Sequence, residues 1–148
     1  RAGAAKRACA AARAATVGAA LALGACSVDG GGIEPTGMGC VDDSQRCIAE
    51  RASARTQLLG DKSRAWVKHP ASASAYASGV RMLAFKQMKR DMSCDELATG
   101  RREADAAPGT LRGPQGQGLT PAQISRGVML AAEVSRELDN EMKRRCRA

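Results

Sequence analysis

The scarcity of large apolar side chains constrains the fold of this chain more than any other feature. From Cys40 to the C-terminus, 109 residues contain only 23 Val, Ile, Leu, Met and aromatic residues, and the chain has three aromatics, Trp66, Tyr76 and Phe85. This number suffices for the core of a small helical bundle, but small cores usually need covalent cross-links for stability. The sequence therefore predicts a thin core that depends on its cysteines.

Helix-start signals predict an all-α fold, a small bundle of three main helices and one short helix. We expect the main helices over 43–67, over 72–92 and from 121 onward, and the short helix from 94 to about 106, followed by a Gly/Pro-rich loop. Capping pairs mark three of these starts: Asp42 with Gln45, Ser93 with Glu96, and Thr120 with Gln123.

Apolar side chains recur at helical spacing in two of the expected helices. This periodicity predicts one buried face on each of them. The first stripe contains Tyr76, Val80, Leu83, Ala84, Met88 and Met92, and the second contains Ile124, Val128, Ala131, Ser135, Leu138 and Met142.

The first 26 residues have the layout of an export signal. Four basic residues lie within 1–13, and an uncharged run of twelve small and apolar residues follows over 14–25. Basic residues, a short apolar run and then small residues are typical of a secretory signal. The run is shorter than the roughly 20 residues that span a bilayer, so we do not expect a permanent transmembrane helix.

The residues Leu23, Gly24, Ala25 and Cys26 resemble the lipobox of bacterial lipoproteins. In that family the Cys thiol receives a diacylglycerol, the peptide before it is removed, and the new amino terminus is usually acylated. The resemblance implies that 1–25 are a signal peptide and that a lipidated Cys26 begins the mature protein. Ser27 at the next position would favour sorting to the outer membrane.

Residues 27–39 are rich in glycine, with five Gly and one Pro, and such a segment does not hold a helix or strand. As a flexible coil it would span about 20 Å. We therefore expect a signal peptide over 1–25, a lipidated Cys and flexible tether over 26–39, and a helical domain over 40–148.

Four cysteines follow the tether, and an even number in an exported protein indicates two disulfides. If helices 43–67 and 72–92 form an antiparallel hairpin, Cys47 lies beside Cys94 and the last helix brings Cys146 near Cys40. We expect Cys47–Cys94 with Cys40–Cys146, and the alternative is Cys40–Cys94 with Cys47–Cys146.

A zinc site is disfavoured, because the nearest cysteine pair, Cys40 and Cys47, is separated by six residues and His69 is the single histidine. We expect no metal and no cofactor.

No catalytic constellation emerges from the sequence. Asp95 and Glu96 are better explained as acids in the first turn of a helix, and one histidine supplies no Ser/His/Asp arrangement. The best binding candidate is a basic patch, which helix order places at the disulfide-bearing end of the bundle. Its residues are Lys86, Lys89, Arg90, Lys143, Arg144 and Arg145.

These patterns predict a non-enzymatic lipoprotein of the cell envelope, an interaction, structural or inhibitor-like module held on the outer membrane and facing the periplasm. Small helical, cysteine-bridged lipoproteins that inhibit lysozyme are a loose parallel in architecture. The expected partners are the membrane, through the lipid anchor, and an envelope protein, an anionic lipid or a cell-wall polymer.

Two alternatives remain open at this point. The first is an envelope enzyme that acts on cell-wall or lipid substrates through carboxylates near 95–105, such as Glu96, Glu103 and Asp105. The second is a cytosolic, basic nucleic-acid-binding protein. Half of the net charge of +8 lies in the first 13 residues, and the other basic residues are interleaved with acids, so we expect no nucleic-acid partner.

Overall fold

The computed structural model describes residue 35 and residues 37–146, and these residues form an all-helical domain. The expected fold class is confirmed, and the described part of the chain contains no strand. The export signal, Cys26 and most of the tether lie outside the described residues. The helices, with 3₁₀ turns marked η, are α1 (Gln45–Gly60), η1 (Ala65–Lys68), α2 (Ala73–Ser78), α3 (Val80–Met88), α4 (Cys94–Arg112), η2 (Pro114–Gly116) and α5 (Pro121–Arg145).

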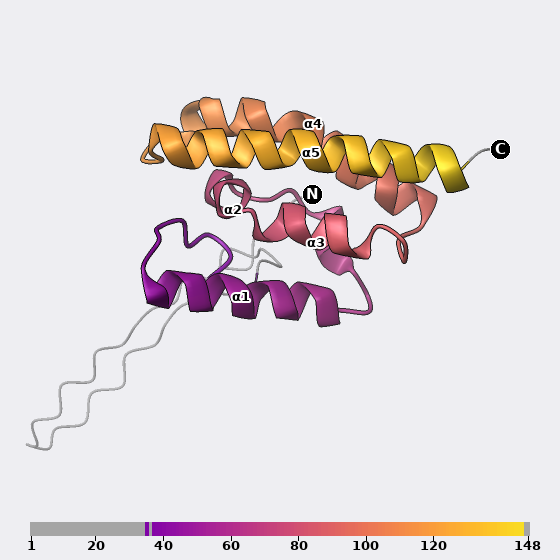
Figure 1. Cartoon of the computed structure of the whole chain (residues 1–148), viewed down its shortest axis with the longest axis horizontal. Coiled ribbons are helices and arrows are strands. Elements are labelled where there is room, and N and C mark those ends of the chain that lie inside the picture. Colours follow the sequence, from indigo (N-terminus) through magenta and orange to yellow (C-terminus); the bar gives the residue numbers. More distant parts are fainter. Residues whose placement is uncertain (1–34, 36, 147–148) are drawn as a thin grey trace, which may run out of the picture. The chain divides into compact units, whose positions relative to one another are not determined.

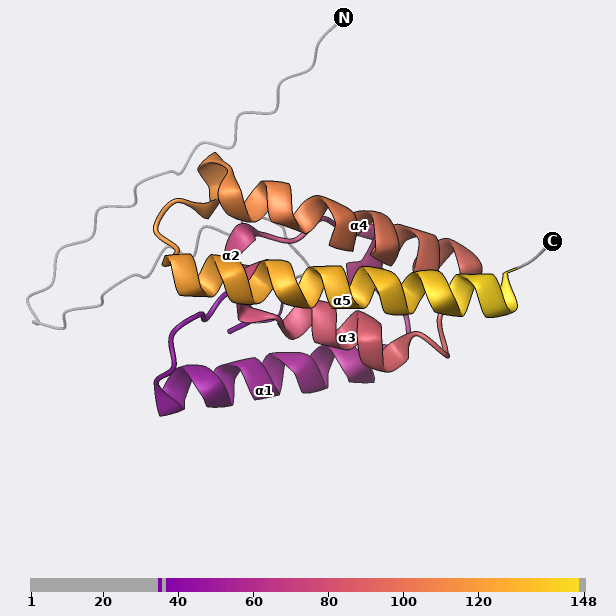
Figure 2. The same cartoon turned by 45° about the horizontal axis from the view of Figure 1, so that its top comes forward.

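The helices are arranged in three layers (Figures 1 and 2). The long helices α4 and α5 pack against each other in antiparallel directions and form one side of the domain. The short helices α2 and α3 lie beneath this pair, and α1 packs on α3 from the opposite side. The largest fully buried side chains include Trp66, Phe85, Met82, Leu97, Leu111 and Leu138.

The helices α1 and α3 run in the same direction, unlike the antiparallel hairpin expected from the sequence (Figure 1). The helix expected over 43–67 ends at Gly60, where the Asp61 side chain accepts a 2.9 Å hydrogen bond from the N–H of Ser63. Such an Asx turn diverts the chain. The following segment, which includes η1, contacts α4 and leads back to the start of α2, and it buries Trp66 in the core.

The two disulfides join Cys40 to Cys47 and Cys94 to Cys146. The sequence correctly predicts two bridges, but both pairings that it favours, Cys47–Cys94 with Cys40–Cys146 and Cys40–Cys94 with Cys47–Cys146, are wrong. Because α1 runs parallel to α3, the starts of α1 and α4 lie at opposite ends of the domain (Figure 1). The start of α4 instead lies beside the end of α5, and this arrangement pairs Cys94 with Cys146.

The helix expected over 72–92 is divided into α2 and α3 at Gly79. Gly79 has a φ of +77°, a left-handed conformation that glycine adopts readily and that interrupts the helix. Leu130 of α5 packs on this turn, and a Cβ at Gly79 would lie 2.8 Å from Leu130 Cδ2. The apolar stripe is still largely buried, with only Leu83 partly exposed among Tyr76, Val80, Leu83, Ala84, Met88 and Met92.

The helix expected to be short is α4, which continues to Arg112 through Pro108. Proline inside a helix removes one backbone hydrogen bond, so the sequence favours a loop there. Burial outweighs this cost, because Ala104, Ala107 and Leu111 are each no more than 1% exposed in the core. The expected capping box is present, with Ser93 and Glu96 each bonded to the backbone N–H of the other.

The start of α5 is confirmed at Thr120. The Thr120 hydroxyl accepts a 3.2 Å bond from the Gln123 N–H, and the Gln123 side chain accepts a 2.8 Å bond from the Thr120 N–H. The buried face is turned slightly from the predicted stripe. Ala131 and Leu138 are buried as expected, whereas Ile124, Val128, Ser135 and Met142 are partly buried and Gly127, Val134 and Glu141 complete the buried face.

The folded body begins before Cys40. Met38 is fully buried, and its N–H bonds to the carbonyl of Pro35 at 3.1 Å. The end of the expected tether is therefore part of the core. The N-cap of α1 is Ser44, and Asp42 accepts a 2.8 Å bond from the Ser44 N–H instead of capping the helix itself. None of the described helices is long and apolar enough to cross a bilayer.

Candidate functional site

The residues of the predicted basic patch gather where α3 and α5 end, near the Cys94–Cys146 bridge. Lys89, Arg90 and Arg144 line a hollow of about 350 Å³, together with Glu137 and Glu141. Arg145 donates hydrogen bonds of 2.9 and 2.8 Å to the carbonyls of Lys89 and Met92 and thereby ties the end of α5 to the segment after α3. The structure thus brings Lys89, Arg90, Arg144 and Arg145 together, and it places two acids among them.

Acidic side chains of α5 neutralise most of this patch. Among its members, only Arg90 has no ion pair in the described part of the chain. The pKa of Glu137 is held below its usual range, chiefly by the hydrogen bond from Lys89, and Arg144 does the same for Glu141. The pairs are Lys86 with Glu133 and Glu137, Lys89 with Glu137, Lys143 with Asp139, and both Arg144 and Arg145 with Glu141.

Three of the four acids named in the alternative catalytic region are held by other side chains of the body. Glu96 closes the capping box and accepts a 2.8 Å bond from Arg64, which is the main reason for its lowered pKa. Asp105 accepts a 2.6 Å bond from the Ser135 hydroxyl. Glu103 faces the core, and Asp95 is exposed. These contacts connect the elements of the fold, and they place the acids in different surroundings.

Glu103 belongs to a buried polar cluster that sequence reasoning missed. It binds Arg81 through both carboxylate oxygens, and the Arg81 guanidinium also donates to the backbone carbonyl of His69. Arg81 is only 1% exposed, and its guanidinium carbon lies 5.2 Å from the centre of the Trp66 ring. A charge so deeply buried requires a partner. The sequence contained one weak signal: Arg81 is three residues before Ala84 and seven before Met88, which places it on the side of the helix that carries the predicted apolar stripe.

Tyr76 borders the same cluster. The pKa of Tyr76 is raised to about 12, mainly by burial and to a smaller extent by the negative charge of Glu103. The phenol therefore stays neutral well above the pH at which a free tyrosine ionises. Tyr76 of α2 and Glu103 of α4 are both enclosed by the core, together with Arg81 of α3. The cluster therefore fixes the relative positions of these three helices.

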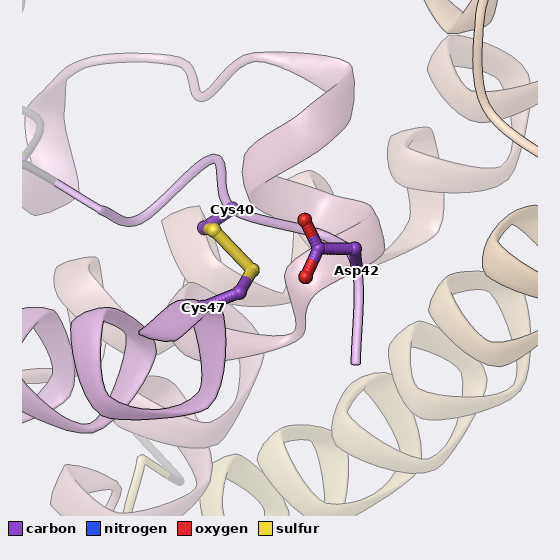
Figure 3. Close-up of side chains that lie close together, drawn as sticks. All are labelled: Cys40, Asp42 and Cys47. Atoms are coloured by element: carbon purple, nitrogen blue, oxygen red, sulfur yellow. A yellow bond between two sulfur atoms is a disulfide. The ribbon is translucent and has the colours of Figure 1, made fainter. Parts of the chain in front are cut away.

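Figure 3 shows the second bridge, which joins Cys40 in the loop before α1 to Cys47 in the first turn of α1. The Asp42 carboxylate points toward it, and one donor atom from each of Cys40, Asp42 and Cys47 lies within 4.8 Å of the others. This is the one such group of potential metal ligands in the described part of the chain. The sulfur atoms are joined to each other, so the thiolates that would bind a metal are not available.

Arg51 also makes this group a poor cation site. Its guanidinium donates to the Cys47 sulfur at 3.4 Å and to the carbonyls of Cys40 and Asp42 at 3.2 and 2.6 Å. A bound metal would share its space with this positive charge. Arg51 instead holds the loop 40–42 against the first turns of α1, a structural role that the residue types alone did not indicate.

Comparison with models of protein families, with curated proteins and with solved structures found nothing that matches this chain.

Proposed function

We propose that the protein is a non-enzymatic lipoprotein of the bacterial cell envelope, anchored through Cys26 and presenting its helical body as an interaction module. The supporting observation is that a lipobox-like sequence precedes a body whose four described cysteines are all joined in disulfides. Disulfides persist in oxidising compartments such as the periplasm and are rare in the cytosol. Both features therefore favour the same location.

The arrangement of the anchor is consistent with this proposal. In the sequence, ten residues, 27–36, separate Cys26 from Gly37, and three of them are glycine. Two or more acyl chains hold a protein stably on a membrane, whereas one chain does so only weakly. Contacts to Glu96, Glu103 and Asp105 from within the body support structural roles for these acids.

Mass spectrometry of the protein isolated from native membranes tests this proposal. We expect a mature chain that begins at an acylated Cys26 and whose remaining cysteines resist alkylation until a reductant is added. Cys26→Ala should prevent processing, and Cys9→Ala serves as the matched control because Cys9 lies in the peptide that is removed. A native protein that retains residues 1–25 and whose cysteines react freely while folded would refute the proposal.

A further inference from the structure

Two neighbouring hollows open on the face formed by α1, α3 and α5. The first, of about 200 Å³, lies between α1 and α3, and Ile48, Ala52 and Leu83 form much of its wall. The second, of about 680 Å³, lies along α5 and includes Met129 and Leu130. Both hollows are lined in part by apolar side chains that do not belong to the central core.

The turn at Gly79 connects these hollows. Its neighbours Ser78 and Val80 line the first hollow, and Leu130 of the second packs directly on Gly79. Figure 2 shows α5, α3 and α1 side by side on this face. The two hollows therefore belong to one continuous surface, which we call the α1/α3/α5 face.

The exposed large apolar side chains of the described residues concentrate on or beside this face. Met129 is 73% exposed and Ile48 is 43% exposed, and both line a hollow. The third such residue, Leu59, lies on α1 about three turns after Ile48, a spacing that places both on the same side of the helix. Aromatic side chains contribute nothing to the face, since Trp66, Tyr76 and Phe85 are buried.

Two arginines on the α1/α3/α5 face lack acidic partners among the described residues. Arg55 lines the first hollow and Arg136 lines the second, and neither makes an ion pair or hydrogen bond with another described residue. This distinguishes them from the basic patch near Cys146, where acids of α5 neutralise the cations. Apolar side chains with methionine and arginine among them are typical of protein interfaces.

We propose that the α1/α3/α5 face binds an acidic amphipathic helix of a partner protein. The apolar stripe of such a helix would occupy the hollows at Ile48 and Met129, and carboxylates beside the stripe would pair with Arg55 and Arg136. This is the helix-in-groove mode of recognition. The inference names the partner class of the interaction module and in that respect rests on the proposed function.

Charge and shape favour an acidic helix over a second copy of the chain and over a bilayer surface. The only carboxylate that lines either hollow is Glu133, and it is already paired with Lys86. The same face of a second copy would therefore offer no free acid to Arg55 and Arg136, which disfavours self-association. A bilayer surface offers no side chains to fill hollows, and the face has none of the exposed aromatic residues that commonly anchor proteins at membrane interfaces.

Binding of synthetic helices to the full chain tests the proposal. The probe is an amphipathic peptide of about five turns, long enough to form a helix, with a leucine stripe flanked by glutamates. The comparison peptide has the same stripe flanked by lysines. We expect the glutamate peptide to bind at least about tenfold more tightly. It should shift the methyl resonances of Ile48, Leu83, Met129 and Leu130.

Charge reversal supplies the matched control. Arg55→Glu with Arg136→Glu should weaken binding of the glutamate peptide by at least about tenfold. Arg102→Glu with Arg112→Glu changes the same charge at exposed positions of α4, away from both hollows, and should have little effect. Unchanged binding in the first double variant would overturn the inference.

Three further outcomes would also overturn the inference. The first is equal affinity for the glutamate and lysine peptides. The others are methyl shifts that appear with anionic phospholipid vesicles and not with peptide, or methyl shifts that appear when the chain associates with itself. The lipoprotein proposal is tested separately. If Cys26 is acylated and no peptide binds, only the proposed partner class is refuted. If peptide binds and Cys26 is unmodified, only the proposed lipid anchor is refuted.

Discussion

Arg81 and Glu103 form an ion pair inside the helical body, with both carboxylate oxygens bonded to the guanidinium and with side-chain exposures of 1% and 9%. Arg81 comes from α3 and Glu103 from α4, so the pair joins the central layer to the long-helix layer. Trp66 and Phe85 cover the guanidinium from the side of the core. The contact is therefore a cross-link between layers.

Removal of one partner from this pair should be costly. We expect Glu103→Gln to lower the free energy of unfolding by roughly 3–5 kcal/mol, because it leaves the buried charge of Arg81 without compensation. Glu133→Gln, which breaks the exposed pair with Lys86, should cause a much smaller loss. Urea denaturation of the oxidised protein measures both values. Equal losses in the two variants would contradict this account of the Arg81 site.

Ionisation of Tyr76 should reveal its buried position. Tyr76 is the only tyrosine, so the absorbance of its phenolate follows one group, with a pKa of about 12 in the folded protein against 10.0 for the free side chain. The folded state holds the phenolic proton of Tyr76 more tightly than the unfolded state does. The contribution of this group to the free energy of unfolding is therefore fully present below pH 10.0 and is lost as the pH rises toward 12. Titration in urea should return the lower value. A folded-state pKa near 10 would contradict the burial.

The two disulfides should contribute unequally to stability. Their cysteines are 52 and 7 residues apart, and the loop-entropy relation then gives about 4 kcal/mol for Cys94–Cys146 and roughly 2.5 kcal/mol for Cys40–Cys47. We expect the paired alanine variant at Cys94 and Cys146 to unfold at a lower urea concentration than the variant at Cys40 and Cys47. Peptide mapping without reduction checks the connectivity itself. The opposite order of stability would argue against loop closure as the main effect.

Two glycines of α4 should respond in opposite ways to alanine. At Gly100 a Cβ would lie 2.6 Å from ring carbons of the buried Phe85, so Gly100→Ala should destabilise the protein by about 1–3 kcal/mol. At Gly109 a Cβ would meet nothing within 4 Å. Gly109→Ala should therefore stabilise α4 by roughly 0.5–1 kcal/mol. Thermal denaturation compares the two, and a change of the same sign in both would contradict the packing at Gly100.

Local sequence signals predicted several elements of the fold correctly. The capping boxes at Ser93 and Thr120 form as expected, because their hydrogen bonds join residues only three positions apart. The periodicity of the second expected helix also identifies most of its buried positions, although Gly79 divides that helix. Where tertiary packing opposed the local signal, as at Pro108, the prediction failed.

The candidate site was less predictable than the fold. The basic residues that meet near Cys146 could be grouped from helix order, but their pairing with Glu137 and Glu141 depends on how α5 is rotated against α3. The hollows beside Ile48 and Met129 have no sequence signature, because isolated apolar residues at partly exposed positions look like core residues in a helical pattern.

The sequence by itself determined that the described body is all-α, where two of its helices start, and that its four cysteines form two bridges. These properties follow from interactions over a few residues or from composition. Only the tertiary structure decided the pairing of Cys94 with Cys146, the continuation of α4 through Pro108 and the burial of Arg81. Each of these depends on contacts between segments that lie far apart in the sequence, as does the contact between the rings of Trp66 and Phe85.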